Sequence, residues 1–145
     1  MGKFKFRFDS IIRIKEILEK RIQEEIAVID REIVDLKNQL KIIFDERMRI
    51  QKNMLERPLK AVEFQSAKMY DSILEKQIQA VQKKIKLVVK KRQEKQNELV
   101  EKRKEQKVFE TLKENQLQEF NIEDRRMELK ETNEIGIRNY HGHQE

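Results

Sequence analysis

The chain has no cysteine or tryptophan, and only one proline and three glycines among its 145 residues. Without cysteine it can form neither a disulfide nor a thiolate metal site, which fits a reducing compartment. No apolar run approaches the roughly 20 residues that span a bilayer, and charge interrupts the first apolar residues, so we expect no membrane helix or secretory signal. Only 6% of the residues are aromatic and 41% are charged, so too few residues could be buried on all sides to form a compact core. This composition is typical of long helices.

A seven-residue repeat of aliphatic side chains runs through the first third of the chain. Its members alternate at spacings of three and four, as in the seam of a left-handed coiled coil. They are Ile22, Ile26, Ile29, Ile33, Leu36, Leu40, Ile43, Arg47, Ile50 and Met54. Arg47 is the one exception to their apolar character. Upstream, Ile11, Ile14 and Leu18 continue the stripe with a shift in phase. The pattern predicts a helix over about residues 9–56.

Pro58, the only proline, separates this helix from a second one. Proline ends a helix and pushes the residue before it into extended backbone, so we expect the turn at about residues 56–62. The second helix should cover about residues 63–135, followed by a frayed tail at 136–145. Its stripe comprises Ala67, Tyr70, Leu74, Ile78, Val81, Ile85 and Val88.

Folding the chain back at about position 60 matches the two stripes. Residue i then faces roughly residue 120 − i, so that apolar stretches face each other and the poor stretch 18–25 faces 94–102. This agreement favours an antiparallel coiled-coil hairpin over a parallel dimer. We therefore predict an all-α fold of two long helices in one domain, residues 1–145, with a C-terminal helical overhang from about residue 116. A monomeric hairpin is expected, and a domain-swapped dimer that opens at the turn is the alternative.

Basic and aromatic residues alternate in the segment Lys3–Phe8. Alternation suits an extended arm whose phenylalanines share one side. Such an arm can touch a membrane surface or pack on an apolar cluster further along the chain, and the register favours packing. That cluster comprises Phe109, Leu112, Leu117 and Phe120. Phe109 and Leu112 face the first helix in this register, where Ile11 and Phe8 are expected, so we assign both to the core.

The net charge is +6 and is unevenly distributed along the chain. Residues 58–107 carry 14 basic and 7 acidic groups. The basic stretch comprises Lys83, Lys84, Lys86, Lys90, Lys91, Arg92, Lys95, Lys102, Arg103, Lys104 and Lys107. Binding to nucleic acid is one interpretation. It is disfavoured because the stretch has no aromatic side chain for base stacking. An acidic protein partner, or simple solubility, explains the stretch better.

Residues that would carry catalysis are missing. The two histidines, His141 and His143, lie at the end of the chain and are too few for a good metal site. The carboxylates alternate with Lys and Arg at helical spacings, as surface ion pairs do. A two-helix coiled coil also has no pocket in which to desolvate a catalytic acid. We therefore expect no enzymatic activity, no cofactor and no metal.

Motifs near both ends of the chain resemble those of the FliJ family, a soluble component of the bacterial flagellar type III export apparatus. Residues 6–16 are similar to the opening of that family, in which an aromatic and a basic residue precede paired aliphatics. Residues 107–114 resemble its Glu-x-Leu-Lys/Arg-Glu stretch, and residues 119–120 match an acidic–aromatic pair. Residues 128–134 resemble Glu-x-Lys-Glu-x-Asp-Glu, with Asn at the usual Asp position, and Tyr140 matches a late aromatic.

The resemblance implies a coiled-coil stalk, similar to the central shaft of rotary ATPases, that enters the hexameric ring of the flagellar export ATPase and promotes its activity. It also implies contacts with the cytoplasmic domain of the export gate and with export chaperones, and a cytoplasmic location at the inner face of the cell membrane. The alternatives are a generic coiled-coil scaffold, a protein that binds export chaperones, or, less favoured, a nucleic-acid-binding rod.

The overhang beyond the paired region is where partner contacts are expected, because its side chains have few neighbours within the chain. The predicted partner-binding residues are Leu117, Glu119, Phe120, Arg126, Glu128, Lys130, Glu134 and Tyr140.

Overall fold

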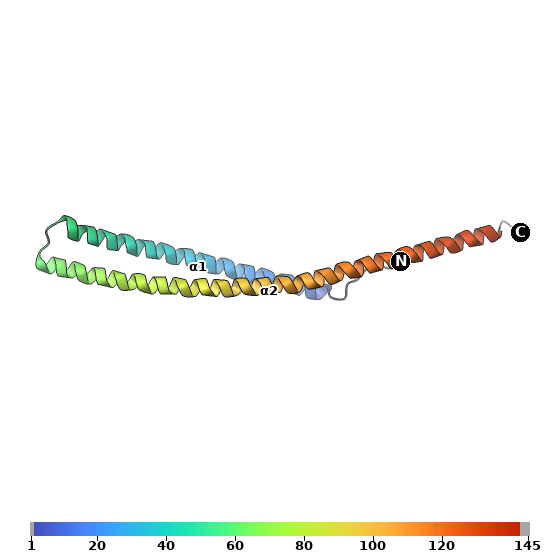
Figure 1. The fold of residues 1–145 in the computed structure, drawn as a ribbon, viewed down its shortest axis with the longest axis horizontal. Helices are drawn as coiled ribbons and strands as arrows, with labels where there is room; N and C mark the ends of the chain where they lie inside the picture. The colour runs from blue at the N-terminus through green and yellow to red at the C-terminus, as the bar shows by residue number, and fades with distance from the viewer. Residues whose placement is uncertain (1, 143–145) are drawn as a thin grey trace. The chain divides into compact units, whose positions relative to one another are not determined.

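The computed structural model describes residues 2–142 and contains two long helices (Figure 1). Helix α1 spans Asp9–Glu56 (48 residues) and helix α2 spans Ala61–Gly142 (82 residues). The described residues contain no strand. The two helices pack against each other, which confirms the predicted all-α helical hairpin with its longer second helix. Within the described part of the chain, no helix is long and apolar enough to cross a membrane.

The turn between the helices lies where the proline predicted it. Helix α1 ends at Glu56, two residues before Pro58, and four non-helical residues follow. At the start of helix α2, the Lys60 carbonyl oxygen accepts a 2.9 Å hydrogen bond from the Phe64 backbone N–H. Proline cannot donate a backbone hydrogen bond and excludes its predecessor from the helical region, so the break occurs before it.

Contacts group the chain into two compact units, which are described separately. One is Lys20–Val100, here called the turn unit; the other combines Met1–Glu19 with Glu101–Glu145 and is called the terminal unit. Each unit contains part of α1 and part of α2. The single-domain organisation stays a prediction.

Aliphatic side chains from both helices make the core of the turn unit. Ile29, Leu36, Val81 and Val88 form one buried cluster, with Ile33, Leu40, Ile43 and Ile85 packed against it. Ile22, Ile26 and Leu99 form a second, smaller cluster. These are positions that the heptad repeat assigns to the seam, and they join residues as the 120 − i register requires.

The predicted shift in phase at the start of α1 is wrong. Ile11 and Ile14 are 37% and 56% exposed, whereas Ile12 is 7% exposed and faces inward. The seam continues back from Ile22 at unbroken spacings of three and four, through Glu19, Lys15 and Ile12. Two of these positions are charged, so the apolar pattern alone pointed to the neighbouring aliphatic residues.

Two residues of α2 that were predicted to be buried, Tyr70 and Leu112, also lie outside the seam. Tyr70 is 41% exposed, and the half-buried Asp71 takes its place, four residues after Ala67. Leu112 is 37% exposed rather than core, while Phe109 is half-buried on the heptad line. A strict alternation of three and four residues from Leu74 in either direction would have selected Asp71 and Phe109.

Helix α2 extends further than predicted at both ends. It begins two residues before residue 63 and continues through Gly136 to Gly142, so residues 136–142 are helical rather than frayed. A single glycine costs a helix about 1 kcal/mol relative to alanine, which does not interrupt 82 residues of otherwise good helix formers. His143 and the two residues after it lie outside the described residues.

Candidate partner-binding surface

The amino-terminal arm, residues 2–8, packs on α2 in the terminal unit. The Phe8 ring lies 5.7 Å from that of Phe109, and the Phe4 ring lies 5.5 Å from that of Phe120, measured between centroids. Phe6, 5% exposed, contacts Phe8 edge to face at 5.6 Å. The predicted packing of the arm on this aromatic cluster is confirmed. Phe8 meets Phe109, however, and not Leu112 as the register suggested.

Ion pairs between the helices continue the terminal unit beyond the aromatic rings. Lys15 Nζ lies 2.8 Å from Glu105 Oε2, and Arg103 Nε lies 2.9 Å from Glu19 Oε1. The hydrogen bond from Lys15, followed by the charge of the nearby Lys102, lowers the pKa of Glu105. Lys113 and Asp9 form a third pair at 2.8 Å. The charged positions on the seam are thus matched across it rather than left without partners.

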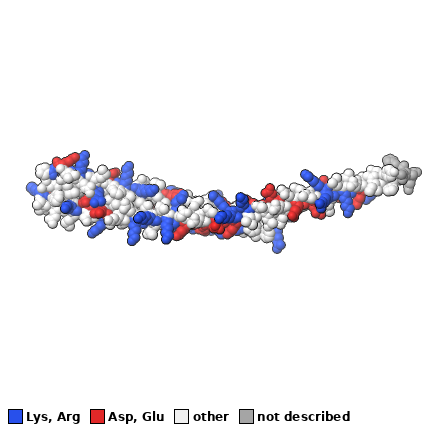
Figure 2. Space-filling model, in the orientation of Figure 1, with Lys and Arg blue, Asp and Glu red and all other residues white. Residues whose placement is uncertain are grey.

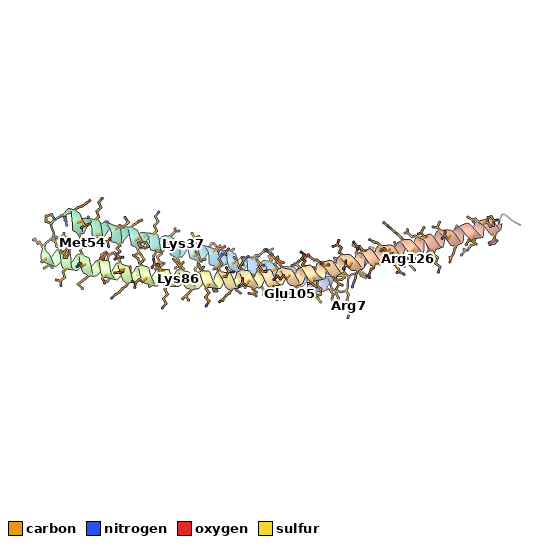
Figure 3. All side chains as sticks on the ribbon, in the orientation of Figure 1. Arg7, Lys37, Met54, Lys86, Glu105 and Arg126 are labelled. Atoms are coloured by element: carbon orange, nitrogen blue, oxygen red, sulfur yellow. The ribbon has the colours of Figure 1, made fainter. Side chains whose placement is uncertain are left out.

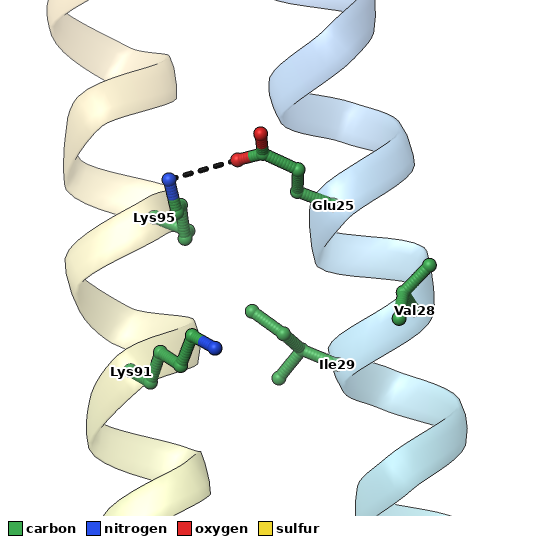
Figure 4. Close-up of a pocket in the computed structure, with 5 residues that line it drawn as sticks. All are labelled: Glu25, Val28, Ile29, Lys91 and Lys95. Atoms are coloured by element: carbon green, nitrogen blue, oxygen red, sulfur yellow. Dashed lines mark ion pairs between the residues drawn. The ribbon is translucent and has the colours of Figure 1, made fainter.

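The weak stretch of the turn unit is organised in the same way. Lys95 Nζ lies 2.8 Å from Glu25 Oε2, and this hydrogen bond lowers the pKa of Glu25 and raises that of Lys95 (Figure 4). One turn further on, the Arg92 guanidinium donates to Asp30. The Lys95–Glu25 pair lines a shallow hollow of about 370 Å³, whose other lining residues are Val28, Ile29 and Lys91.

Arg47 finds its partner at the other end of the turn unit. Its Nε lies 3.0 Å from Asp71 Oδ1, and its Nη2 lies 3.7 Å from Glu75 Oε2. The Gln51 amide also donates to Asp71 at 3.2 Å. Sequence reasoning marked Arg47 as the exception in the heptad repeat but missed Asp71. The 120 − i register would have found Asp71 within two residues of the position facing Arg47.

The first three predicted partner-binding residues lie where the arm covers α2. Leu117 is 37% exposed, and Phe120 is half-buried against Phe4. Glu119 and Phe120 line a shallow hollow together with Lys3 and Phe4 of the arm. The expectation that α2 has almost no partner from residue 116 onward is therefore corrected, because the arm reaches it at Phe120.

The other five predicted residues lie on the overhang, residues 121–142, of which Glu123 still lines the hollow beside the arm. Arg126, Glu128, Lys130, Glu134 and Tyr140 are all exposed there, and Figure 3 labels Arg126 on this stretch. The Tyr140 ring contacts His141. Arg126, Lys130 and Glu134 follow one another at spacings of four on one face of α2, and Tyr140 lies close to that face, whereas Glu128 lies on the opposite face. Their role in binding stays a prediction.

Exposed apolar side chains are what the overhang offers a partner. They are Ile122, Met127, Leu129, Ile135 and Ile137, each between 53% and 64% exposed. Sequence reasoning selected charged residues here and omitted these aliphatic ones. Their signal was weak because only Ile122 and Leu129 keep a seven-residue spacing. Burial of apolar surface is nevertheless the main driving force of most protein association.

Groups suited to binding rather than to chemistry dominate the described residues. Among residues 2–142, no buried polar or charged residue is present, and no cluster of three or more His, Asp or Glu side chains could hold a metal ion. The titratable groups with shifted pKa values are held in ion pairs or hydrogen bonds between side chains. What the arrangement supplies is a fixed register between two helices and an exposed helical end.

The chain matches a model of a known protein family. The family model described as the flagellar FliJ protein matches residues 4–145. No curated protein and no solved structure matches the chain. The match covers nearly the whole sequence, including the arm, both helices and the overhang.

Proposed function

Because the chain belongs to the flagellar FliJ protein family and is thereby a component of the flagellar export apparatus, we propose that it acts as a non-enzymatic stalk of that apparatus. In this role it binds the ring of the export ATPase and the cytoplasmic domain of the export gate, and promotes substrate export. It works in the cytoplasm, at the inner face of the cell membrane, to which its partners attach it. The family match over residues 4–145 carries this proposal.

The inter-helix ion pairs support a mechanical role. A stalk must transmit a displacement without its helices sliding past one another. In the turn unit, Arg47–Asp71 and Lys95–Glu25 connect the helices at separate heights of the seam. A slip by one heptad would separate both pairs, so polar positions on the seam specify its register. Their main value here is specificity, because an intact ion pair at such a partly buried position adds little net stability, although removing one partner is costly.

The overhang supports a contact role. Its exposed aliphatic side chains, such as Ile122 and Leu129, become buried only if a partner covers them. A ring interior or a chaperone groove would provide such cover. The same surface therefore also serves the second candidate function, escort of export chaperones, and binding measurements separate the two.

The rate of ATP hydrolysis by the cognate export ATPase tests the proposal directly. Titration with the purified chain should raise the rate to a plateau, because the stalk promotes assembly of the active ring. A double variant, Ile122→Asp and Leu129→Asp, should require more protein to reach that plateau. The matched control places the same charges at Val28 and Val34, each 55% exposed on α1.

An unchanged hydrolysis rate at saturating stalk would contradict the ATPase role. Calorimetry with the same variants then measures binding to the gate domain and to chaperones. These measurements distinguish a scaffold or a chaperone escort from a stalk. A scaffold would bind one of these proteins and leave hydrolysis unaffected.

A further inference from the structure

Four lysines surround one exposed leucine on α2 in the turn unit. Lys83 and Lys84 lie four and three residues before Leu87, and Lys90 and Lys91 lie three and four residues after it. Residues three and four apart are neighbours on a helix surface, so all four ammonium groups frame the same side chain. Leu87 is 63% exposed, and each of the lysines is exposed. This set of five residues is called the lysine collar.

The collar is the part of the basic stretch that the hairpin itself leaves uncompensated. Arg92, Lys95 and Arg103 each form an ion pair with a carboxylate of α1. None of the four collar lysines forms an ion pair in the part of the chain that the structure describes. Lys91 is a minor contributor to the lowered pKa of Glu25.

The position of the collar explains this difference. The seam of α2 passes through Val81, Ile85 and Val88, which lie about 100° to 160° around the helix from Leu87. Lys83, Leu87 and Lys90 therefore face away from α1. Lys84 and Lys91, seven residues apart, flank the seam, and Lys91 borders the hollow beside Ile29 (Figure 4). Lys and Arg side chains project from the surface of the molecule in Figure 2.

We propose that the lysine collar is a docking surface for an acidic amphipathic helix of a partner protein. Such a helix places an apolar residue against Leu87 and carboxylates, three and four residues to either side, against the four lysines. This is the arrangement by which flanking charges select partners at a helix–helix contact. The proposal goes beyond the contacts with the ATPase and the gate and does not depend on them.

The chemistry of the collar favours a protein helix over other polyanions. Nucleic acid would use the lysines but gives an aliphatic side chain nothing to contact, and the collar has no aromatic ring on which a base could stack. An anionic bilayer attracts lysines, but one leucine buries too little apolar surface for a helix to insert. A partner helix is the occupant that uses both the charge and Leu87.

A synthetic peptide provides the probe. It has about three heptads with leucine on one face and glutamate on both sides of that face, and carries a fluorophore. Its anisotropy is followed as the full-length chain is added at low and at physiological salt. A single small contact should give weak binding, on the order of 10–100 μM. The affinity should fall with salt, because the contact pairs exposed charges.

Two variants and their matched controls decide the outcome. Leu87→Gln, and the replacement of all four collar lysines by Gln, should each weaken binding about ten-fold or more. Ile17→Gln alters an aliphatic side chain of almost equal exposure, 62%, on α1 and outside both proposed binding surfaces. A control with Lys20, Lys41, Lys60 and Lys107 changed to Gln removes the same charge elsewhere. Both controls should bind as the parent does, and circular dichroism should show unchanged helicity in all four.

Three results would overturn the proposal. Binding that responds to the scattered lysine control as strongly as to the collar variant would show an effect of net charge alone. Tighter binding to duplex DNA or to phosphatidylserine vesicles, insensitive to Leu87→Gln, would assign the collar to a polyanion or a membrane. No binding at millimolar concentration would remove the docking surface altogether. None of these results bears on stimulation of the ATPase.

Discussion

Leu99 and Leu87 are the same residue type on the same helix in opposite environments, so they measure how much the seam contributes. Leu99 is 4% exposed and packs with Ile22 and Ile26, whereas Leu87 is 63% exposed. Replacing each by alanine changes helix propensity equally and slightly in favour of the helix. The difference between the two variants therefore reports burial at the seam.

The expected magnitude follows from the surroundings of Leu99. A Leu→Ala substitution in an enclosed core costs about 2–5 kcal/mol. The seam of a two-helix hairpin is open at its sides, so solvent and neighbouring side chains fill part of the space. We expect Leu99→Ala to lower the free energy of unfolding by about 2 kcal/mol, the lower end of that range. Leu87→Ala should change it by less than about 0.5 kcal/mol, as surface substitutions do.

Urea titration followed by circular dichroism at 222 nm measures both values. The slope of the unfolding free energy against urea should stay constant across the parent and the two variants, which shows that the same transition is compared. Equal losses in the two variants would refute the reasoning, since the apolar cluster around Leu99 would then contribute no more than exposed surface. A loss confined to Leu87→Ala would place the seam on the wrong face of α2.

Three further predictions test the terminal unit and the polar seam. Phe120→Ala removes the contact with Phe4, one of the two ring contacts between residues 2–8 and α2, so limited proteolysis should cleave the arm faster while helicity is retained; an unchanged cleavage rate would contradict the packing of Phe4 on Phe120. Asp71→Ala leaves Arg47 without its carboxylate on the seam and should lower the melting temperature, whereas replacing both residues with Leu should restore or raise it. The pKa of Glu25 is lowered from its ordinary value of 4.5, so the ionised carboxylate stabilises the fold at pH values above 4.5, and this contribution is lost as the pH falls through the lower pKa of the folded state. Glu25→Gln should therefore make the free energy of unfolding depend less on pH in acid. An identical pH profile for the parent and the variant would show that the pair does not form in solution.

Periodicity alone located most of the fold. The heptad series in residues 22–54, the single proline and the match of the two stripes about position 60 were enough to predict two antiparallel helices and their register. These features are local or depend on simple spacing, so they can be read directly from residue types. The family was likewise recognisable from short motifs near the two ends.

The prediction from apolar periodicity failed at the charged residues of the seam. Apolar periodicity passes over Lys15 and Asp71, so it selected Ile14 and Tyr70 beside them, which are exposed. Asp71 occupies the seam because Arg47 lies across from it. That pairing depends on a residue 24 positions away and is invisible to any local pattern.

Sequence by itself thus determined the class of fold, the position of the turn, the register and the family. Only the tertiary structure decided which charges are matched, that the arm covers α2 as far as Phe120, and that the helix continues through Gly136. The physical reason is the range of the interactions concerned. Helix formation and heptad burial depend on neighbours within one or two turns, whereas ion pairs and aromatic contacts depend on which distant side chains the hairpin brings together. The lysine collar depends on both ranges: helical spacing places the four lysines around Leu87, and the tertiary structure, over the residues it describes, provides no carboxylate partner for them.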